Sequence, residues 1–382
     1  MSTYLDHNAT AVVRPEARAA VAHALEVGGN PSSIHAAGRA ARALVELARD
    51  EVAALIAAPA STVIFTSGGT EANALALESA VAAGSRRLIV SAIEHDSIQE
   101  TSRVLGVAVE ALPVDKTGQA DMAWLQARLA GWDTADGKPF VALMLANNET
   151  GVIQPVAQAA ELVRGAEGWL HVDAIQAAGK IPVDSRALGA DTLSISAHKI
   201  GGAQGVGALT FGPRATLSRR QHGGGQERGR RGGTENTPGI AGFGAAAKAA
   251  LRDLEEYARR DVWRDAAAAQ LKAAGASVMG ERAPRLSNTL CVATPGFPSD
   301  VQIMNLDLAG VMVSAGSVCS SGKVKASPVL EAMGQGSLAG CAIRVSGGWN
   351  TTQGDWNRFV EAWTAAHARY TARHAQPAIV GA

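Results

Sequence analysis

The amino-acid sequence predicts an α/β fold with a large domain, built on a mainly parallel sheet, and a smaller α+β domain. From residue 62 onward, short apolar runs alternate with stretches of helical composition, an order typical of strands joined by helices. Towards the C-terminus the pattern changes to shorter apolar runs with helices between them. The length of 382 residues is sufficient for two domains that share a sizeable core.

The individual elements are expected in the following order. A helix is predicted at 15–27, where Pro15 suits the first helical position, and another within 35–58, which Pro59 closes. A long helical segment from about 238 to 274 is expected to link the two domains, which we place at 15–255 and at 1–14 together with 256–382. The other predicted strands are 63–66, 88–92, 107–112, 141–146, 170–172, 290–293, 311–313 and 342–345, and the other helices 71–83, 97–105, 122–129, 156–164 and 355–373.

Composition indicates a small-molecule site. Hydrophobic residues make up 47% of the chain and the formal net charge is zero, so nothing favours nucleic acid or an anionic membrane surface as a partner. Apolar stretches are too short for a membrane span and the polar N-terminus does not resemble a signal peptide, so we expect a cytoplasmic protein. The three cysteines form no CxxC pair, and we expect neither a disulfide framework nor a metal site.

Lys199 is the first candidate for chemistry. It lies in a glycine-flanked turn between two apolar runs, 192–196 and 206–211, which predict strands. Desolvation in such a turn lowers a lysine pKa toward the neutral amine that Schiff-base chemistry needs. Ser196 and His198 are near enough in sequence to place donors beside it. The competing interpretation is an ordinary surface lysine in a polar turn.

The residues that follow the predicted strands are the next candidates, because ligands collect at the carboxyl ends of parallel strands. Gly69 and Thr70 open a helix after the first strand, which favours a phosphate, although a plain helix cap explains them too. His95 follows the second strand and could stack on a ring or move protons, or be structural. Asn148 follows the fourth strand and could reach the same crevice; the alternative is a plain turn with no role in binding.

The fifth strand ends in Asp173, and a buried carboxylate there needs a partner. A protonated pyridine nitrogen would serve, with Gln176 close enough to hold the same ring; a structural ion pair or helix cap is the alternative. Cys319 lies in a small polar loop suited to a reactive thiol, whereas Cys291 and Cys341 border apolar strands and are expected to be packing residues.

Together these motifs resemble the NifS/IscS-type cysteine desulfurases, which are pyridoxal-phosphate enzymes of the aminotransferase-like fold. The resemblance implies a large domain with a mainly parallel sheet of the seven-stranded type. It runs over nearly the whole chain and rests on several motifs in register. The motifs, each given by its first residues, are Tyr4-Leu-Asp, Gly29-Asn-Pro-Ser-Ser-Ile-His, Phe65-Thr-Ser-Gly-Gly-Thr-Glu-Ala-Asn, Ala146-Asn-Asn-Glu-Thr-Gly, His171-Val-Asp-Ala-Ile-Gln, Ser196-Ala-His-Lys, Gly223-Gly-Gly-Gln-Glu-Arg-Gly and Ser317-Val-Cys-Ser-Ser-Gly.

The resemblance also implies a role for each matching residue. By this reasoning, Lys199 is the Schiff-base lysine, Cys319 the sulfur-accepting nucleophile, and His95 the residue that stacks on the ring and handles the proton of the substrate thiol. The remaining assignments are Asp173 as partner of the ring nitrogen, Gln176 as donor to the ring oxygen, Gly69, Thr70, Ser196 and His198 as phosphate ligands, Thr234 as a phosphate ligand from the neighbouring subunit of a homodimer, and Asn148 and Arg344 as ligands of the substrate carboxylate.

The implied activity is conversion of L-cysteine to L-alanine, with the sulfur passed through an enzyme persulfide to an acceptor such as an iron–sulfur scaffold protein. A selenocysteine lyase and an aminotransferase on the same fold are the alternatives, and a sulfur-delivery scaffold without activity is a third. Three segments depart from the family pattern: His7-Asn8 replaces the usual Asn-Ala, Ala203-Gln204 the common Pro-Lys, and Gly347-Gly-Trp349 the commoner Leu-Gly-Arg. They leave the reaction intact and affect the loops around the site.

Overall fold

The large sheet of the computed structural model has seven strands in the order β2-β8-β7-β6-β5-β3-β4. The structure describes residues 2–316 and 326–374. Strands β3 to β7 pair in parallel, while β8 is antiparallel to both of its neighbours, so β2 runs in the same direction as β7. The strands are β2 (Val63–Thr66), β3 (Arg87–Ser91), β4 (Ala108–Leu112), β5 (Phe140–Ala142), β6 (Trp169–Asp173), β7 (Thr192–Ser196) and β8 (Gly207–Phe211).

Helices cover both faces of this sheet, and the alternation of side chains along each strand explains why. In β3, Ile89 contributes to one apolar core while Leu88 and Val90 contribute to another on the opposite face. The first core includes residues of α2 (Ala36–Leu55), α5 (Met122–Ala130), α6 (Val156–Gly165) and α7 (Thr237–Arg252), with α1 (Pro15–Val27) packed on α7. The second includes residues of α3 (Gly69–Ala82) and α4 (Asp96–Val104).

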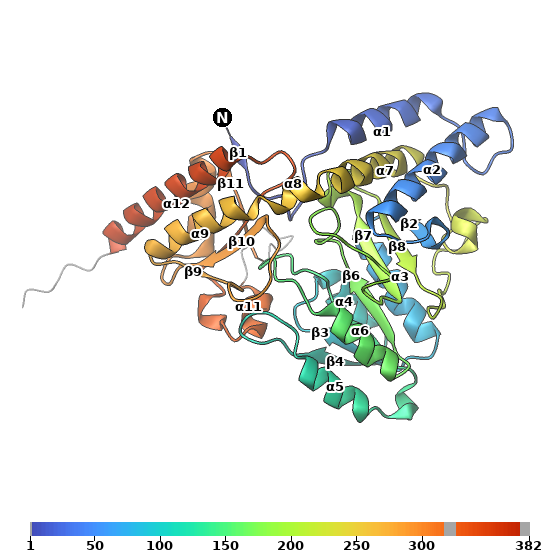
Figure 1. The fold of residues 1–382 in the computed structure, drawn as a ribbon, viewed down its shortest axis with the longest axis horizontal. Coiled ribbons are helices and arrows are strands. Elements are labelled where there is room, and N and C mark those ends of the chain that lie inside the picture. The colour runs from blue at the N-terminus through green and yellow to red at the C-terminus, as the bar shows by residue number, and fades with distance from the viewer. Residues whose placement is uncertain (1, 317–325, 375–382) are drawn as a thin grey trace, which may run out of the picture.

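The rest of the chain forms a second, smaller layer of sheet and helices (Figure 1). Its four-stranded antiparallel sheet has the order β12-β13-β10-β9, and a two-stranded parallel pair, β1 with β11, lies beside it. Its strands are β1 (Thr3–Tyr4), β9 (Ser277–Val278), β10 (Thr289–Ala293), β11 (Val311–Met312), β12 (Ser314–Ala315) and β13 (Ala342–Ser346), and its helices α9 (Asp261–Ala273), α10 (Ser299–Leu308), α11 (Pro328–Ala332) and α12 (Gln353–His374).

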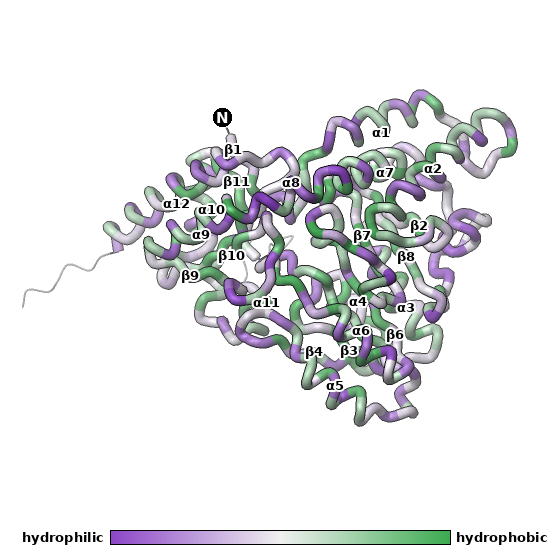
Figure 2. Tube along the Cα trace, viewed as in Figure 1, coloured by the Kyte–Doolittle hydropathy of each residue, from purple (hydrophilic) through white to green (hydrophobic). Residues whose placement is uncertain are grey.

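Helix α12 shows how the sequence specifies this smaller layer. Its buried residues Trp356, Phe359, Val360 and Trp363 recur at intervals of three or four and share an apolar core with residues of β10 and β13, so the helix is amphipathic (Figure 2). Within the described residues, no helix is both long enough and apolar enough to span a membrane.

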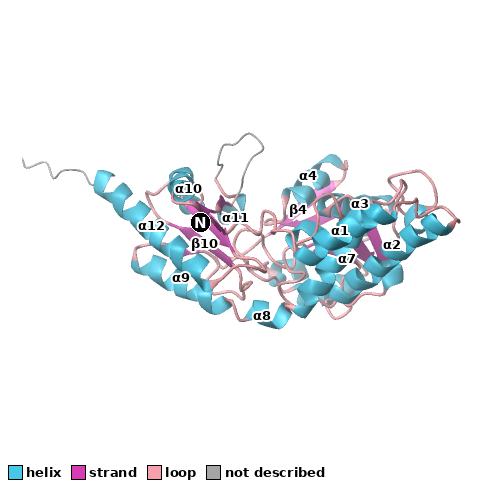
Figure 3. Ribbon diagram, turned by 90° about the horizontal axis from the view of Figure 1, so that it is seen from above, coloured by secondary structure: helices cyan, strands magenta, loops and turns pink. Residues whose placement is uncertain are grey.

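The segment expected to be helical at 238–274 is helical over most of its length, but it is not continuous. The segment is three helices, α7, the short α8 (Leu254–Ala258) and α9, and α8 lies between the two layers (Figure 3). The first break falls at Asp253, whose carboxylate forms an ion pair with Arg14 at 2.5 Å. An ion pair with a distant segment of the chain thus lies at the point where α7 ends.

The strand expected at 141–146 is also shorter than predicted. Strand β5 ends at Ala142, although the amides of Leu143 and Leu145 still donate to the carbonyls of His171 and Asp173. The amide of Met144 turns instead to the buried carboxylate of Glu94 at 2.5 Å. The segment that leads to Asn148 is thus held by a side chain, which the strand pattern does not reveal.

Candidate active site

The predicted strand-end residues meet at one edge of the large sheet, because β2, β3, β5, β6 and β7 all run towards it. A cavity of about 260 Å³ opens there. A larger cavity of about 490 Å³, lined by Arg164, Asp191 and Arg214 among others, lies where β7 begins and contains none of the predicted residues. The site cavity is lined by Gly69, Thr70, His95, Ser97, Met144, Asn148, Asp173, Ile175, Gln176, Ser196, His198 and Lys199.

Lys199 follows β7 in a short 3-10 turn and turns its amine towards the N-terminal segment of the chain. The amine donates to the carbonyl oxygens of Asn8, at 2.7 Å, and Ala9, at 2.8 Å. Burial, reinforced by the positive charge of Arg344, lowers the pKa of Lys199 to about 8. A lysine with this pKa is partly a neutral amine near neutral pH, and a neutral amine has the nucleophilicity that covalent chemistry needs. The lowered pKa does not by itself decide between a reactive lysine and an ordinary lysine in a polar turn.

Asp173 ends β6 and is 4% exposed. Its carboxylate accepts hydrogen bonds from the amide of Ile175 at 2.9 Å and from the Asn73 side chain at 2.8 Å. Burial raises the pKa of Asp173, and Lys199 and His95 act in the opposite direction. Among the described residues no basic side chain lies within 4 Å of this carboxylate. A cationic group in the cavity would therefore find its counter-charge here.

Asn73 is a site residue for which sequence reasoning gave no role. Its amide nitrogen donates to Asp173 and, at 2.9 Å, to Ser97, whose hydroxyl is 2.9 Å from Nδ1 of His95. The two residues expected on either side of a ring, His95 and Asp173, are thus joined through hydrogen bonds. The signal in the sequence is spacing, since Asn73 lies four residues after Gly69 on helix α3 and so shares its face.

The start of α3 provides an anion site. Gly68, at the N-cap, makes no side-chain hydrogen bond, so the first backbone N–H groups of the helix have no cap. A Cβ atom at Gly69 would lie 2.3 Å from Cδ1 of Ile175, so a larger residue here would displace the end of that side chain. The buried hydroxyl of Ser196 has no hydrogen-bond partner in the structure, although it lines the same cavity.

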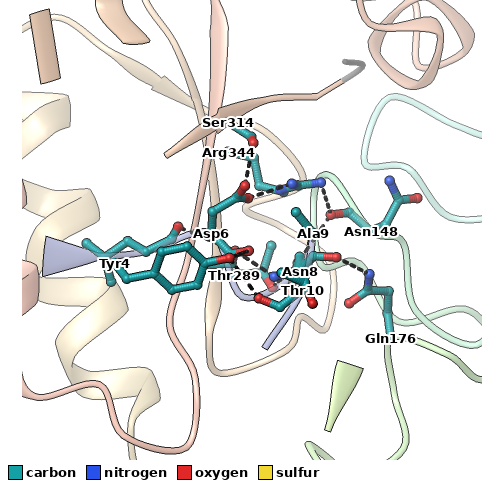
Figure 4. A network of polar contacts seen from close by, with 12 residues as sticks. Tyr4, Asp6, Asn8, Ala9, Thr10, Asn148, Gln176, Thr289, Ser314 and Arg344 are labelled. Atoms are coloured by element: carbon teal, nitrogen blue, oxygen red, sulfur yellow. Dashed lines mark hydrogen bonds and ion pairs between the residues drawn. The ribbon is translucent and has the colours of Figure 1, made fainter. Parts of the chain in front are cut away.

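Arg344 lies on β13 and reaches the site from the smaller layer (Figure 4). Its guanidinium donates to Asp6 at 2.8 Å and to the carbonyl oxygen of Asn148 at 3.3 Å, while its buried Nε atom has no partner. The other oxygen of Asp6 accepts a hydrogen bond from Ser314 at 2.7 Å. Arg344 and Asn148 therefore lie together at one side of the site, with Asp6 as a neighbour that sequence reasoning did not assign.

Among the described residues, two of the predicted ones, Arg344 and Thr234, do not line the cavity. Thr234 is exposed and lines a separate cavity with Ser67 and Arg231. Cys319 lies outside the described residues. Of the other cysteines, Cys291 is buried and its surroundings raise its thiol pKa, as expected for a packing residue.

Comparison with known proteins identifies the family. The class-V aminotransferase model matches residues 3–359. The chain is 42% identical over 340 residues to a cysteine desulfurase of Cereibacter sphaeroides, covering 86% of each chain, and 38% identical to a cysteine desulfurase IscS of Dictyoglomus turgidum, covering 92% of this chain and 90% of that one. The crystal structure of a NifS-like protein from Rickettsia africae superposes with a TM-score of 0.88 at 32% identity, covering 96% of this chain and 100% of the other.

This chain belongs to the cysteine desulfurases of the class-V aminotransferase family. The resemblance expected from the motifs is confirmed, as is the α/β fold with its mostly parallel sheet. Pyridoxal phosphate is the cofactor of the family and of this protein.

The residues present fit this coenzyme. The uncapped start of α3 and the partnerless Ser196 hydroxyl suit a phosphate group. The buried Asp173 carboxylate, which lacks a basic partner among the described residues, suits a protonated ring nitrogen. The amine of Lys199 lines the same cavity and suits the coenzyme aldehyde.

The departures from the desulfurase pattern fall beside the site. His7 is buried next to Gly348, where an added Cβ would lie 1.8 Å from its Nδ1 atom. Trp349 donates to the Val12 carbonyl at 2.7 Å. Gln204 is exposed on the turn after Lys199. The departure at His7-Asn8 thus lies within the N-terminal segment that contacts Lys199, and the departure at Gly347-Trp349 packs against that segment.

Proposed function

We propose that this protein converts L-cysteine to L-alanine and transfers the sulfur to its own Cys319 as a persulfide. The observation that carries the proposal is the lysine of lowered pKa in a cavity with a buried, unneutralised Asp173, in a chain that is similar to cysteine desulfurases over most of its length. The coenzyme supplies an aldehyde that joins amines and a ring that withdraws electrons from the substrate Cα.

Lys199 is proposed as the residue that holds the coenzyme and then moves the substrate Cα proton. An amine of lowered pKa accepts a proton from carbon and returns it more readily than an ordinary lysine, which is almost fully protonated at neutral pH. Asp173 keeps the ring nitrogen protonated, and Gln176 donates to the ring oxygen. Gly69, Thr70, Ser196 and His198 bind the phosphate.

Arg344 and Asn148 are proposed to bind the substrate carboxylate. Arg344 lies within a strand and is buried, so its guanidinium direction is fixed, and its Nε atom is free to donate. His95 is exposed to the cavity and is positioned by its contact with Ser97. We assign to it the stack on the ring and the proton of the substrate thiol.

Cys319 is proposed as the nucleophile toward the substrate sulfur. The thiolate forms a new S–S bond while the Cβ–S bond of the substrate breaks. The electron pair of the broken bond stays with the carbon skeleton, which takes up protons to become alanine. The persulfide sulfur then passes to an acceptor protein, for which an iron–sulfur scaffold is our first candidate.

We also propose a cytoplasmic homodimer with the domains at 15–255 and at 1–14 with 256–382. The exposure of Thr234 supports the dimer, because a phosphate ligand outside the cavity of its own chain is explained if it serves the neighbouring subunit.

The deciding experiment incubates the purified protein with L-cysteine, measures alanine and locates the persulfide by peptide mass. Cys319→Ala is expected to bind coenzyme and L-cysteine but to form no alanine catalytically, whereas the matched variant Cys341→Ala keeps turnover. Alanine formation at the normal rate by Cys319→Ala would favour a selenocysteine lyase. Amino transfer that depends on a 2-oxo acid would favour an aminotransferase.

A further inference from the structure

Lys180 is a buried lysine that no role above uses. It follows β6 in the same turn as Gln176, four residues later, and is 3% exposed. Its amine donates to Oε1 of Gln176 at 2.6 Å and to Oδ1 of Asn8 at 3.0 Å. Both acceptors are neutral amide oxygens, and among the described residues no carboxylate lies within 4 Å of the amine. A buried lysine without an acid partner is costly and calls for an explanation.

The contacts of Lys180 determine which way the Gln176 amide faces. A side-chain amide has one acceptor end and one donor end, and the two can exchange by a flip. Because Oε1 accepts from Lys180, the nitrogen Nε2 faces the other way and donates to the carbonyl of Asn8 at 2.9 Å, and Gln176 itself lines the cavity. Without Lys180, only the Asn8 carbonyl would oppose a flip that turns an acceptor towards the cavity.

The same amine fixes the side chain of Asn8. Oδ1 of Asn8 accepts from Lys180 and from Asn288, at 3.2 Å, so its nitrogen is left to donate to Thr289 at 2.9 Å. The carbonyl of Asn8 in turn accepts from the catalytic Lys199. Lys180 therefore contacts one residue that lines the cavity, Gln176, and one that contacts Lys199, Asn8, while Lys180 does not line the cavity itself.

The electrostatic surroundings of Lys180 agree with the absence of an acid partner among the described residues. Burial, and then the charges of Lys199 and Arg344, hold its pKa well below the usual range, and no acid opposes them. Both contacts of the amine are acceptors, so its N–H groups can serve the two amide oxygens at once.

We propose that Lys180 is a positioning residue that fixes the amide of Gln176 with its NH2 group towards the ring oxygen of the coenzyme. If the Gln176 amide were flipped, its oxygen Oε1 would face the ring oxygen of the coenzyme, and neither atom can donate a hydrogen bond. The inference rests on the proposed role of Gln176, through which Lys180 acts.

The test is a double-mutant cycle on apo-protein titrated with pyridoxal phosphate. The proteins are the wild type, Lys180→Met, Gln176→Ala and the double variant, and the measurements are the coenzyme dissociation constant and the absorbance maximum of the bound coenzyme. Each single change is expected to weaken binding roughly tenfold and to shift the maximum, while the double variant binds no more weakly than Gln176→Ala alone. Lys272→Met, at a half-exposed lysine on α9, is the matched control and should change neither quantity.

An unchanged dissociation constant and absorbance maximum in Lys180→Met, with both altered in Gln176→Ala, would overturn the inference alone. So would losses that multiply in the double variant. If Gln176→Ala changes neither quantity, the proposed role of Gln176 is wrong and the inference fails with it. Thermal unfolding of each apo-protein checks the fold. Should Lys180→Met not fold, Lys180→Gln takes its place, because glutamine keeps a polar group in the site but is one bond shorter. The dissociation constant and the absorbance maximum of that variant then test the inference in the same way.

Discussion

The Asp6 carboxylate accepts a hydrogen bond from Arg344 at 2.8 Å and so joins the segment that follows β1 to strand β13. The pair is nearly buried, with side-chain exposures of 18% and 6%. Asp6 thus holds one edge of the guanidinium and leaves Nε without a partner. The rigid planar group is presented to the site in one orientation, which is the arrangement that recognises a carboxylate.

Arg344→Lys is therefore expected to raise KM for L-cysteine by about tenfold or more while kcat changes less, because an ammonium cannot reproduce the planar fork. Steady-state kinetics of alanine formation measures both constants. Arg103→Lys, an exposed arginine on α4, is the control and should behave as the wild type. A KM equal to that of the wild type in Arg344→Lys would contradict the assignment.

The pKa of Lys199, lowered to about 8, predicts how fast apo-protein takes up the coenzyme at different pH. The neutral amine is the reactive form, so the rate should rise with pH through a midpoint near 8 and level off above it, whereas an ordinary lysine would continue to rise to about pH 10.4. Stopped-flow absorbance measures the rate, with a free lysine derivative for comparison. Lys199→Ala should form no borohydride-reducible bond, while Lys248→Ala, at an exposed lysine, should form it normally. A profile that matches the free amine would refute the lowered pKa.

Asn73→Ala is expected to destabilise the apo-protein by about 2–4 kcal/mol, because several buried polar groups lose a partner at once. The Asn73 amide oxygen accepts from Ser194 and lies 3.0 Å from Nε2 of His171, and its nitrogen donates to Asp173. Denaturant unfolding gives the free energy. Asn357→Ala, on the exposed side of α12, is the control and should change it by less than about 0.5 kcal/mol. Equal effects of the two substitutions would argue against the network.

The lowered pKa of His171 predicts that the free energy of unfolding falls in acid. Burial lowers its pKa to about 3 in the folded protein, against an ordinary value of 6.5. The folded state therefore binds this proton less readily than the unfolded state, and the contribution is complete above pH 6.5 and lost as pH falls towards 3.

At pH 5 the loss from His171 alone amounts to about 2 kcal/mol relative to pH 7. His171→Gln should reduce the difference in unfolding free energy between the two pH values by this amount. His23→Gln, at an exposed histidine on α1, should leave the difference unchanged. The proposal of a neutral buried His171 does not survive if both variants keep the full difference.

The family, the sheet and most of the site were determined by the sequence alone. Each strand-end motif in the large sheet is local: a few apolar residues form the strand, and the polar residue after it must emerge at the carboxyl edge. Lys199, Asp173 and His95 follow such strands, so their meeting in one cavity was predictable from chain order. The resemblance added roles that spacing alone left open.

Tertiary structure decided what depends on contacts between distant segments. The break between α7 and α8 lies at the ion pair of Asp253 with Arg14, and Asp6 holds the guanidinium of Arg344. Lys180 reads in the sequence as one lysine among many, and only the fold removes its water and leaves it the amide oxygens of Gln176 and Asn8. The physical reason is that desolvation and hydrogen-bond direction belong to the packed chain, whereas strand periodicity belongs to neighbours in sequence.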